Sequence, residues 1–265
     1  MRVACIQLEP RFGDRDGNME RAAEAVRRAA GAGVTLAILP ELYPSGYAMT
    51  SRDEARELAE PIPGGPSVER LIALARETGC RLVMGLAEQH GERVYNSSVA
   101  VGPRGVLAVY RKLHLFQKEL DWFDPGEARP PVADIGQARI GMMICFDWIF
   151  PEAARSLAID GADVICHPSN LVLHFCQDAM VTRCIENRVF ALTCNRIGRE
   201  ARGEQDLTFT GCSQITGLEG KVLARAAADR EETIMADIDP SAARDKLATP
   251  RNDVLQQRRP EIYQR

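Results

Sequence analysis

The sequence predicts an α/β fold in which mixed sheets lie inside and helices cover their outer faces, a layered α/β sandwich. Three observations predict it: apolar runs of strand length recur along the chain, amphipathic helical segments separate several of them, and hairpin-like strand pairs occupy residues 97–110 and 211–226. The 265 residues are enough for one α/β domain with a large core. We therefore expect residues 1–265 to form a single domain.

The expected strands are short apolar runs, and no Gly- or Ser-rich linker interrupts their order. Strands and helices alternate early in the chain, and pairs of strands follow one another later, which indicates mixed sheets rather than purely parallel ones. The runs are 3–8, 34–39, 81–87, 97–102, 105–110, 138–145, 163–167, 190–195, 211–216, 221–226 and 232–238.

Four helices are expected from apolar residues that recur on one helical face. Asn18 is of a type that caps helix starts, Pro66 suits a first helical turn, and Gly79 and Gly161 suit helix ends. The predicted helices are 19–31, 66–78, 151–160 and 174–187.

The charged residues nearly balance, with 33 Lys and Arg against 37 Asp and Glu, and the net charge is -4. Because no long basic run occurs, we expect no nucleic-acid partner and instead a small-molecule substrate. No apolar run is long enough for a signal peptide or a membrane span. These features predict a cytoplasmic protein that does not bind membranes.

The eight cysteines are scattered through apolar segments, so we expect them to be reduced. No C-x2-C pair occurs, and the four histidines lack the spacing of zinc ligands. The sequence therefore predicts no metal site.

Cys145 is the leading candidate nucleophile, because it lies between an apolar run and the start of the predicted helix 151–160. A thiol at such a turn faces a cleft, close to backbone N–H groups that can stabilise an oxyanion. Glu41 ends a second apolar run and Lys112 ends a third. A glutamate, a lysine and a cysteine at three strand ends predict one site.

These residue types suit covalent hydrolysis. A free thiol is mostly protonated near neutrality, so Cys145 needs a base or a cation beside it. Glu41 is expected to take the thiol proton, while Lys112 and the backbone N–H of Phe146 face the oxygen or nitrile nitrogen that gains charge.

Other readings of the same residues stay open. A buried cysteine is most often a small apolar side chain, and a single charged residue at a strand end is usually solvated. His114 or His167 could pair with Cys145 as in cysteine proteases, although a supporting or core position suits them better.

The chain resembles the nitrilase superfamily, the carbon–nitrogen hydrolases, along nearly its whole length, and Glu41, Lys112 and Cys145 match the Glu-Lys-Cys triad of that family in order. The matching segments are Val3-Ala4-Cys5-Ile6-Gln7, Leu39-Pro40-Glu41-Leu42, Ser45-Gly46-Tyr47, Asn96-Ser97-Ser98, Tyr110-Arg111-Lys112-Leu113-His114-Leu115, Phe123-Asp124-Pro125-Gly126, Cys145-Phe146-Asp147, Pro151-Glu152 with Arg155, His167-Pro168-Ser169-Asn170 and residues 183–188.

The resemblance implies an αββα four-layer sandwich without a metal or organic cofactor. It also implies hydrolysis of a non-peptide C–N bond through a thioester or thioimidate on the cysteine, and homodimers or larger assemblies. Glu119 fits the place of a second glutamate that positions substrate and holds the charge of Lys112; a solvated loop acid is the alternative. Residues 239–265 are expected to be a frayed tail or an arm that packs on another subunit.

Four residues are expected to contact substrate: Asn170 lies where family members line the pocket, Phe116 and Trp148 are candidate walls, and Phe146 supplies its N–H. Asp147, with Glu152 and Arg155, is expected to form a polar network beneath the cysteine turn.

Three functions are compatible with the resemblance to this superfamily. Phe146-Asp147 replaces the Trp-Glu pair typical of true nitrilases, which favours an amide or N-carbamoyl substrate. Hydrolysis of a small nitrile is the alternative, and a non-catalytic binding protein on the same fold is a second alternative.

Overall fold

The computed structural model describes residues 1–263, and two six-stranded sheets form its centre. The first sheet has the order β14-β1-β2-β3-β4-β5, in which β1, β2 and β3 are parallel and the other pairs antiparallel. Its strands are β1 (Arg2–Gln7), β2 (Val34–Ile38), β3 (Arg81–His90), β4 (Arg93–Gly102), β5 (Gly105–Arg111) and β14 (Glu232–Asp237).

The second sheet has the order β13-β12-β9-β8-β7-β6. Strands β7, β8 and β9 are parallel, and the other neighbouring pairs are antiparallel. Its strands are β6 (Val132–Asp134), β7 (Arg139–Met142), β8 (Val164–Pro168), β9 (Phe190–Cys194), β12 (Gln214–Thr216) and β13 (Val222–Arg225).

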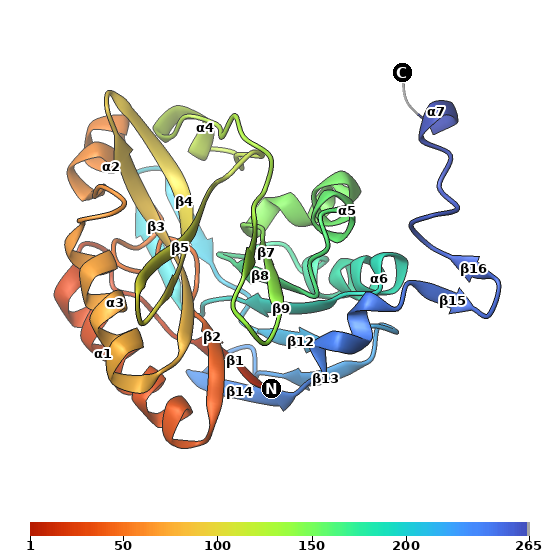
Figure 1. Cartoon of the computed structure of the whole chain (residues 1–265). Coiled ribbons are helices and arrows are strands. Elements are labelled where there is room, and N and C mark those ends of the chain that lie inside the picture. Colours follow the sequence, from red (N-terminus) through yellow and green to blue (C-terminus); the bar gives the residue numbers. More distant parts are fainter. Residues whose placement is uncertain (264–265) are drawn as a thin grey trace.

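Helices cover the outer face of each sheet (Figure 1). α1 (Arg15–Gly31) and α3 (Pro66–Thr78) pack on the first sheet, and α5 (Pro151–Ile159) and α6 (Cys176–Asn187) pack on the second. The predicted α/β fold with four αββα layers is confirmed.

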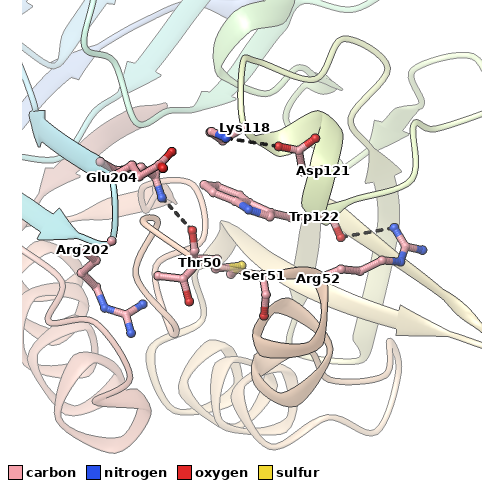
Figure 2. A pocket seen from close by; sticks show the side chains of 11 residues that line it. Thr50, Ser51, Arg52, Lys118, Asp121, Trp122, Arg202 and Glu204 are labelled. Carbon is pink, nitrogen blue, oxygen red and sulfur yellow. Dashed lines mark hydrogen bonds and ion pairs between the residues drawn. The ribbon is translucent and has the colours of Figure 1, made fainter.

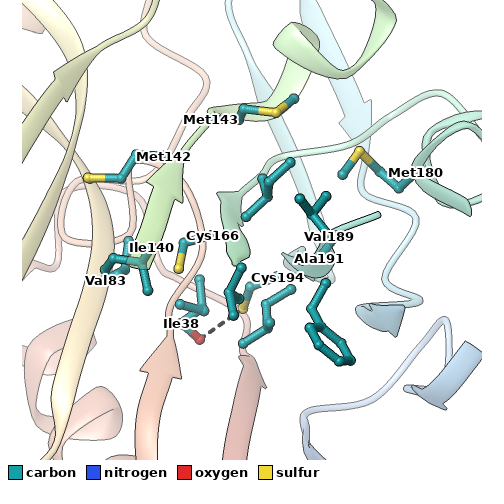
Figure 3. Packing of buried hydrophobic residues seen from close by; sticks show 14 of the residues in the cluster. Ile38, Val83, Ile140, Met142, Met143, Cys166, Met180, Val189, Ala191 and Cys194 are labelled. Carbon is teal, nitrogen blue, oxygen red and sulfur yellow. Dashed lines mark hydrogen bonds between the residues drawn. The ribbon is translucent and has the colours of Figure 1, made fainter. Parts of the chain in front are cut away.

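The two sheets share the apolar core that Figure 3 shows. Successive side chains of β1 point to opposite faces of the sheet. Val3 and Cys5 therefore face the second sheet, whereas Ala4 and Ile6 face the helices. The thiol of Cys194 on the second sheet lies 3.1 Å from the carbonyl oxygen of Ile38 on the first. All eight cysteines are free.

Three predicted boundaries were wrong. Asn18 does not cap α1: Asp14 does, by accepting from the Gly17 amide at 3.0 Å. Asn18 is buried instead, and its amide binds the carbonyls of Arg11 (2.8 Å) and Pro44 (3.0 Å).

The strand predicted at 138–145 also ends early, because β7 stops at Met142. Cys145 opens the 3-10 turn η1 (Cys145–Ile149). The predicted strand 211–216 is shortened to β12 because Gly211 and Cys212 have positive φ angles of 56° and 53°.

Several short elements were not predicted because they are brief and largely polar. They include β6, α2 (Arg52–Leu58), α4 (Glu119–Trp122) and the separate hairpin of β10 (Arg199–Arg202) and β11 (Gln205–Thr208). Of these elements, α4 carries the candidate site residue Glu119.

The C-terminal residues leave the sheets and extend past α6 (Figure 1). They form η2 (Pro240–Arg244), a small hairpin of β15 (Leu247–Thr249) and β16 (Asn252–Asp253), and α7 (Pro260–Tyr263). Lys246 ties the hairpin to the end of α6 by donating to the carbonyls of Asn187 (3.1 Å) and Arg188 (2.9 Å). Packing of this arm on another subunit stays a prediction, and residues 264–265 lie outside the described part.

Across residues 1–263, every helix is too short or too polar to cross a bilayer. The same residues contain no group of three His, Cys, Asp or Glu side chains placed to hold a metal ion.

Candidate active site

Cys145 lies at a left-handed turn between β7 and α5, with a φ of 39°. Its side chain is buried rather than openly exposed, since only 5% of the residue is accessible. His167 fixes the turn: its Nε2 lies 2.8 Å from the Cys145 carbonyl and must donate, because a carbonyl oxygen only accepts. Burial lowers the pKa of His167 to about 4 despite this hydrogen bond, so the ring is neutral at pH 7.

Asp147 anchors the same turn from below. Its carboxylate accepts from the Ile144 amide at 2.9 Å and the Tyr110 hydroxyl at 2.8 Å, and it lies 2.7 Å from Nδ1 of His114. His114 and His167 therefore support the turn rather than pairing with the thiol. The network predicted around Asp147 omits Glu152, which is exposed, and Arg155, which approaches the Val254 carbonyl at 3.5 Å.

Glu41, Lys112 and Glu119 form a fully buried cluster. Nζ of Lys112 lies 2.7 Å from Oε1 of Glu41 and 2.8 Å from Oε2 of Glu119. Glu41 follows β2, Lys112 follows β5, and Glu119 begins α4, so three separate segments meet here. Gly85 permits the approach, because a side chain there would lie 2.5 Å from the Glu41 Cα.

Two further side chains fix the carboxylates. Asn96 donates from Nδ2 to Oε1 of Glu41 (2.7 Å) and to Oε2 of Glu119 (3.3 Å), and the Tyr47 hydroxyl donates to Oε1 of Glu119 (2.8 Å). Within residues 1–263, Oε2 of Glu41 has no hydrogen-bond partner. Glu41 thus keeps one buried oxygen free, whereas both oxygens of Glu119 are bound.

Electrostatics keep the ammonium charged and the thiol protonated. Burial opposes the charge of Lys112, but the carboxylates of Glu119 and Glu41 outweigh it and raise the lysine pKa. Burial is also the main reason why the pKa of Cys145 is well above its usual value; Glu41 raises it further, and Lys112 opposes the shift. The thiol can therefore become nucleophilic only by giving its proton to a base as it reacts.

Burial likewise raises the pKa of Glu119, with Lys112 acting against the shift. Burial thus favours the protonated form of Glu119, while its contact with the Lys112 ammonium favours the charged form.

A small pocket opens over Cys145, and the predicted contact residues line it together. Its walls are Phe116, Phe146, Trp148, Asn170 and residues 171–173. Neither polar atom of the Asn170 side chain has a hydrogen-bond partner within the described chain, although the residue is only 3% exposed. A buried amide without partners is costly, so this side chain suits a polar ligand.

Two outer hollows continue from this pocket. The first shares Phe116 and Val172 with it, and the second shares Lys118 and Gln205 with the first. The outermost cavity, shown in Figure 2, has a volume of about 220 Å³, against about 10 Å³ over the thiol. Space close to Cys145 is therefore no larger than one water molecule, and larger groups must extend outward.

Sequence reasoning did not assign the parts played by Tyr47 and Asn96, and for His167 it gave only a supporting or core position. All three lie in segments that carry the family resemblance, but nothing in a linear sequence gives the direction of their side chains. The one hint in the sequence was that polar residues occur within apolar segments near the candidate carboxylates, because a buried polar group needs a hydrogen-bond partner.

Comparison with known proteins agrees with this geometry. The family model for carbon-nitrogen hydrolase matches residues 2–246. A nitrilase from Pyrococcus abyssi is 43% identical over 263 residues, 99% of each chain. An (R)-stereoselective amidase from a Pseudomonas species is 34% identical and covers 90% of this chain and 86% of its own length.

Solved structures show the same fold. An amidase from Nesterenkonia sp. AN1 has a TM-score of 0.81 at 27% identity, covering 98% of this chain and 97% of the other. Nit3 from Saccharomyces cerevisiae, a nitrilase-superfamily member, has a TM-score of 0.81 at 29% identity and covers 92% and 91%. In a mutant of the Nesterenkonia amidase, the active-site cysteine carries the acetamide moiety of fluoroacetamide. With the family model spanning nearly all of its residues, this chain belongs to the carbon–nitrogen hydrolase family.

Proposed function

We propose that the protein hydrolyses a non-peptide C–N bond in a small amide or N-carbamoyl compound through an acyl-cysteine intermediate. The observation that carries the proposal is the buried Glu41–Lys112–Glu119 cluster, whose charges act on the Cys145 thiol and in which Oε2 of Glu41 has no hydrogen-bond partner within residues 1–263. That oxygen is a base without a competing partner.

In the first step, Glu41 accepts the thiol proton while the sulfur of Cys145 bonds to the substrate carbonyl carbon. The carbonyl electron pair moves to oxygen, where the Lys112 ammonium and the Phe146 N–H supply donors. The tetrahedral adduct then loses ammonia or an amine, which takes the proton held by Glu41, and a thioester remains.

In the second step, Glu41 removes a proton from water as the water attacks the thioester carbon. Collapse of this adduct breaks the C–S bond, and the thiolate of Cys145 regains a proton. Glu119 serves by holding Lys112 in place through its short contact, and no metal or organic cofactor takes part in any of these steps.

The substrate-binding proposal rests on the pocket walls. Phe116, Phe146 and Trp148 offer apolar surface, and the unpaired amide of Asn170 can bind the polar group that reacts. Curated relatives named N-carbamoylputrescine amidase, one of them 32% identical, support a carbamoyl substrate.

Hydrolysis of a small nitrile is the second candidate, because the Pyrococcus abyssi relative is named a nitrilase. The same residues would form a thioimidate, and two waters would then release the acid and ammonia. A matched amide and nitrile with the same carbon skeleton separate the two activities by the ratio of their rates. A non-catalytic binding protein remains the second alternative.

We also propose a cytoplasmic homodimer or larger homo-oligomer. Free cysteines throughout the chain support a reducing compartment. Large apolar side chains exposed on η1, α5, α6 and just before α6 support a subunit contact there: Ile149, Ile159, Phe175 and Ile185.

The test measures ammonia release from a panel of small amides, N-carbamoyl amines, N-carbamoyl amino acids and nitriles, with Cys145→Ala beside the wild type. Loss of release in the variant supports the proposal, and equal release by both proteins would refute it. Cys212→Ala is a matched control, because Cys212 also has a left-handed backbone, with a φ of 53°, and lies outside the site. We expect it to retain full activity.

A further inference from the structure

The hairpin of β10 and β11 is a separate two-stranded sheet, and its side chains form hydrogen bonds to the backbone of the loop that contains Tyr47. Oε2 of Glu200 on β10 accepts from the amides of Tyr47 (3.0 Å) and Ala48 (2.6 Å). Arg202 donates to the Ala48 carbonyl at 2.9 Å, and Gln205 donates to the Met49 carbonyl at 2.6 Å. Side chains of the hairpin therefore bind three consecutive residues of the loop.

The hairpin and the loop face each other beside the outer pocket (Figure 2). Arg202 and Glu204 lie on the hairpin side, Thr50 and Ser51 on the loop side, and Trp122 of α4 between Lys118 and the loop. The hairpin thus lies close to the helix that also presents Glu119.

Arg196 fixes Glu200 from behind through a buried ion pair. The same guanidinium donates to the carbonyls of Ile197 and Pro10, each at 3.1 Å, and lies 4.0 Å over the ring of Phe209. With charge, hydrogen bonds and ring contact all satisfied, the Glu200 carboxylate has one well-defined position.

Tyr47 continues this chain of contacts into the active site. Its ring packs edge-on against Phe209 at 5.9 Å and against Trp122 at 6.0 Å, measured between ring centroids. Its hydroxyl binds Glu119, which in turn binds the Lys112 ammonium. The path from Glu200 to Lys112 is made entirely of buried groups in direct contact.

We propose that Glu200 is a positioning residue, which holds the Tyr47 backbone so that the Tyr47 hydroxyl fixes Glu119 and, through it, Lys112. The inference rests on the proposed function, in which Lys112 stabilises charge on the substrate. Lys112 sits between two carboxylates, so freeing Glu119 lets the ammonium shift toward Glu41 and away from the reacting group.

The experiment compares Tyr47→Phe, Glu200→Gln and their double variant by kcat, KM and the pH dependence of Cys145 alkylation by iodoacetamide. Each single variant should lower kcat about tenfold with little change in KM, because a transition-state contact is loosened rather than a binding contact removed. The double variant should be no slower than the slower single variant, since both changes break the same path. The alkylation midpoint should move in the same direction in all three.

Two controls keep the result interpretable. Glu200→Asp keeps the charge opposite Arg196 but withdraws the carboxylate from the loop, so it must also lower kcat even if Glu200→Gln fails to fold. Arg199→Gln, which removes an exposed ion pair with Asp206 on the same hairpin, should leave kcat unchanged.

Additive losses in the double variant, or a wild-type alkylation profile in Tyr47→Phe and Glu200→Asp, would overturn the positioning role. A wild type without turnover on any amide, carbamoyl compound or nitrile would count against the proposed function instead. The alkylation assay needs no substrate, so it still tests the path from Glu200 to Lys112, whose charge acts on the Cys145 thiol.

Discussion

Arg111 and Lys112 are neighbours in the sequence, and each binds a buried glutamate on an opposite side of the chain. The two ion pairs differ in how many carboxylate oxygens accept hydrogen bonds. Glu88 accepts from both the Nε (3.0 Å) and Nη2 (2.6 Å) of Arg111 and from the Ser97 hydroxyl (2.6 Å). Glu41 binds Lys112 through Oε1 alone, and its second oxygen is unpaired within the described chain.

One strand end therefore serves both stability and chemistry. A carboxylate whose two oxygens both accept hydrogen bonds, like that of Glu88, holds neighbouring parts of the sheet together. A carboxylate with a free oxygen is costly to bury but can accept a proton from a reacting group. The number of satisfied oxygens, rather than burial, separates Glu41 from Glu88.

The two glutamates should respond very differently to the same substitution. Glu41→Gln should lower kcat by about 10²- to 10⁴-fold because the base is lost, while Glu88→Gln should leave kcat nearly unchanged and destabilise the fold by about 1–3 kcal/mol. Steady-state rates and urea unfolding measure the two effects. A comparable loss of kcat in Glu88→Gln would contradict the distinction.

Removing the cation from each pair should lower the unfolding free energy by different amounts. Lys112→Met leaves Glu41 and Glu119 facing each other in the interior and should cost about 3–5 kcal/mol of unfolding free energy. The deficit should shrink at acid pH, where one of the two carboxylates takes up a proton. Arg111→Met, whose side chain is partly solvated, should cost about 1–3 kcal/mol, and urea melts at pH 5 and pH 8 compare the two.

His167 gives a pH test of the turn beneath the thiol. Its pKa is about 4 in the folded protein, lower than in the unfolded chain, so the unfolded state binds more protons at acid pH. The corresponding stability is complete above about pH 6.5 and is lost as pH falls toward 4, by about 3 kcal/mol in total. A His167→Gln variant should lack this part of the pH dependence, and an unchanged slope would show that another group is responsible.

Loss of the Ser97 hydroxyl should have the smallest effect and should change stability alone. Ser97→Ala removes one of three donors to Glu88 and should cost about 1 kcal/mol of unfolding free energy with no change in kcat. Thermal melts and steady-state assays on the same preparation check both points. A fall in kcat here would mean that the two pairs are coupled.

Much of the fold followed from residue pattern. Apolar runs marked the long strands, and the stripes on 19–31 and 66–78 marked the helices that cover the first sheet, because burial of one face dictates those periods. Asn18 shows the limit: it has the right chemistry for a cap, but its burial against Pro44 depends on a distant loop. The β10–β11 hairpin is short and polar, so no periodicity distinguishes it from a loop.

The candidate site was predictable where chemistry coincides with a strand end. Glu41, Lys112 and Cys145 each follow an apolar run, and their acid, cation and thiol groups suit one reaction. Tyr47 and Glu200 could not be linked by that reasoning, because their contact depends on how two separate loops pack. Spacing along the chain contains no information on such a contact.

The left-handed backbone at Cys145 has a consequence for the evolution of the protein. Glycine occupies this region of backbone space more easily than any residue with a side chain, by about 1–2 kcal/mol. Selection for stability alone would therefore draw this position toward an inactive residue, although burial of the thiol offsets part of the gain. If descendants of this gene keep a cysteine at this turn, the sequence alone indicates continued selection for turnover.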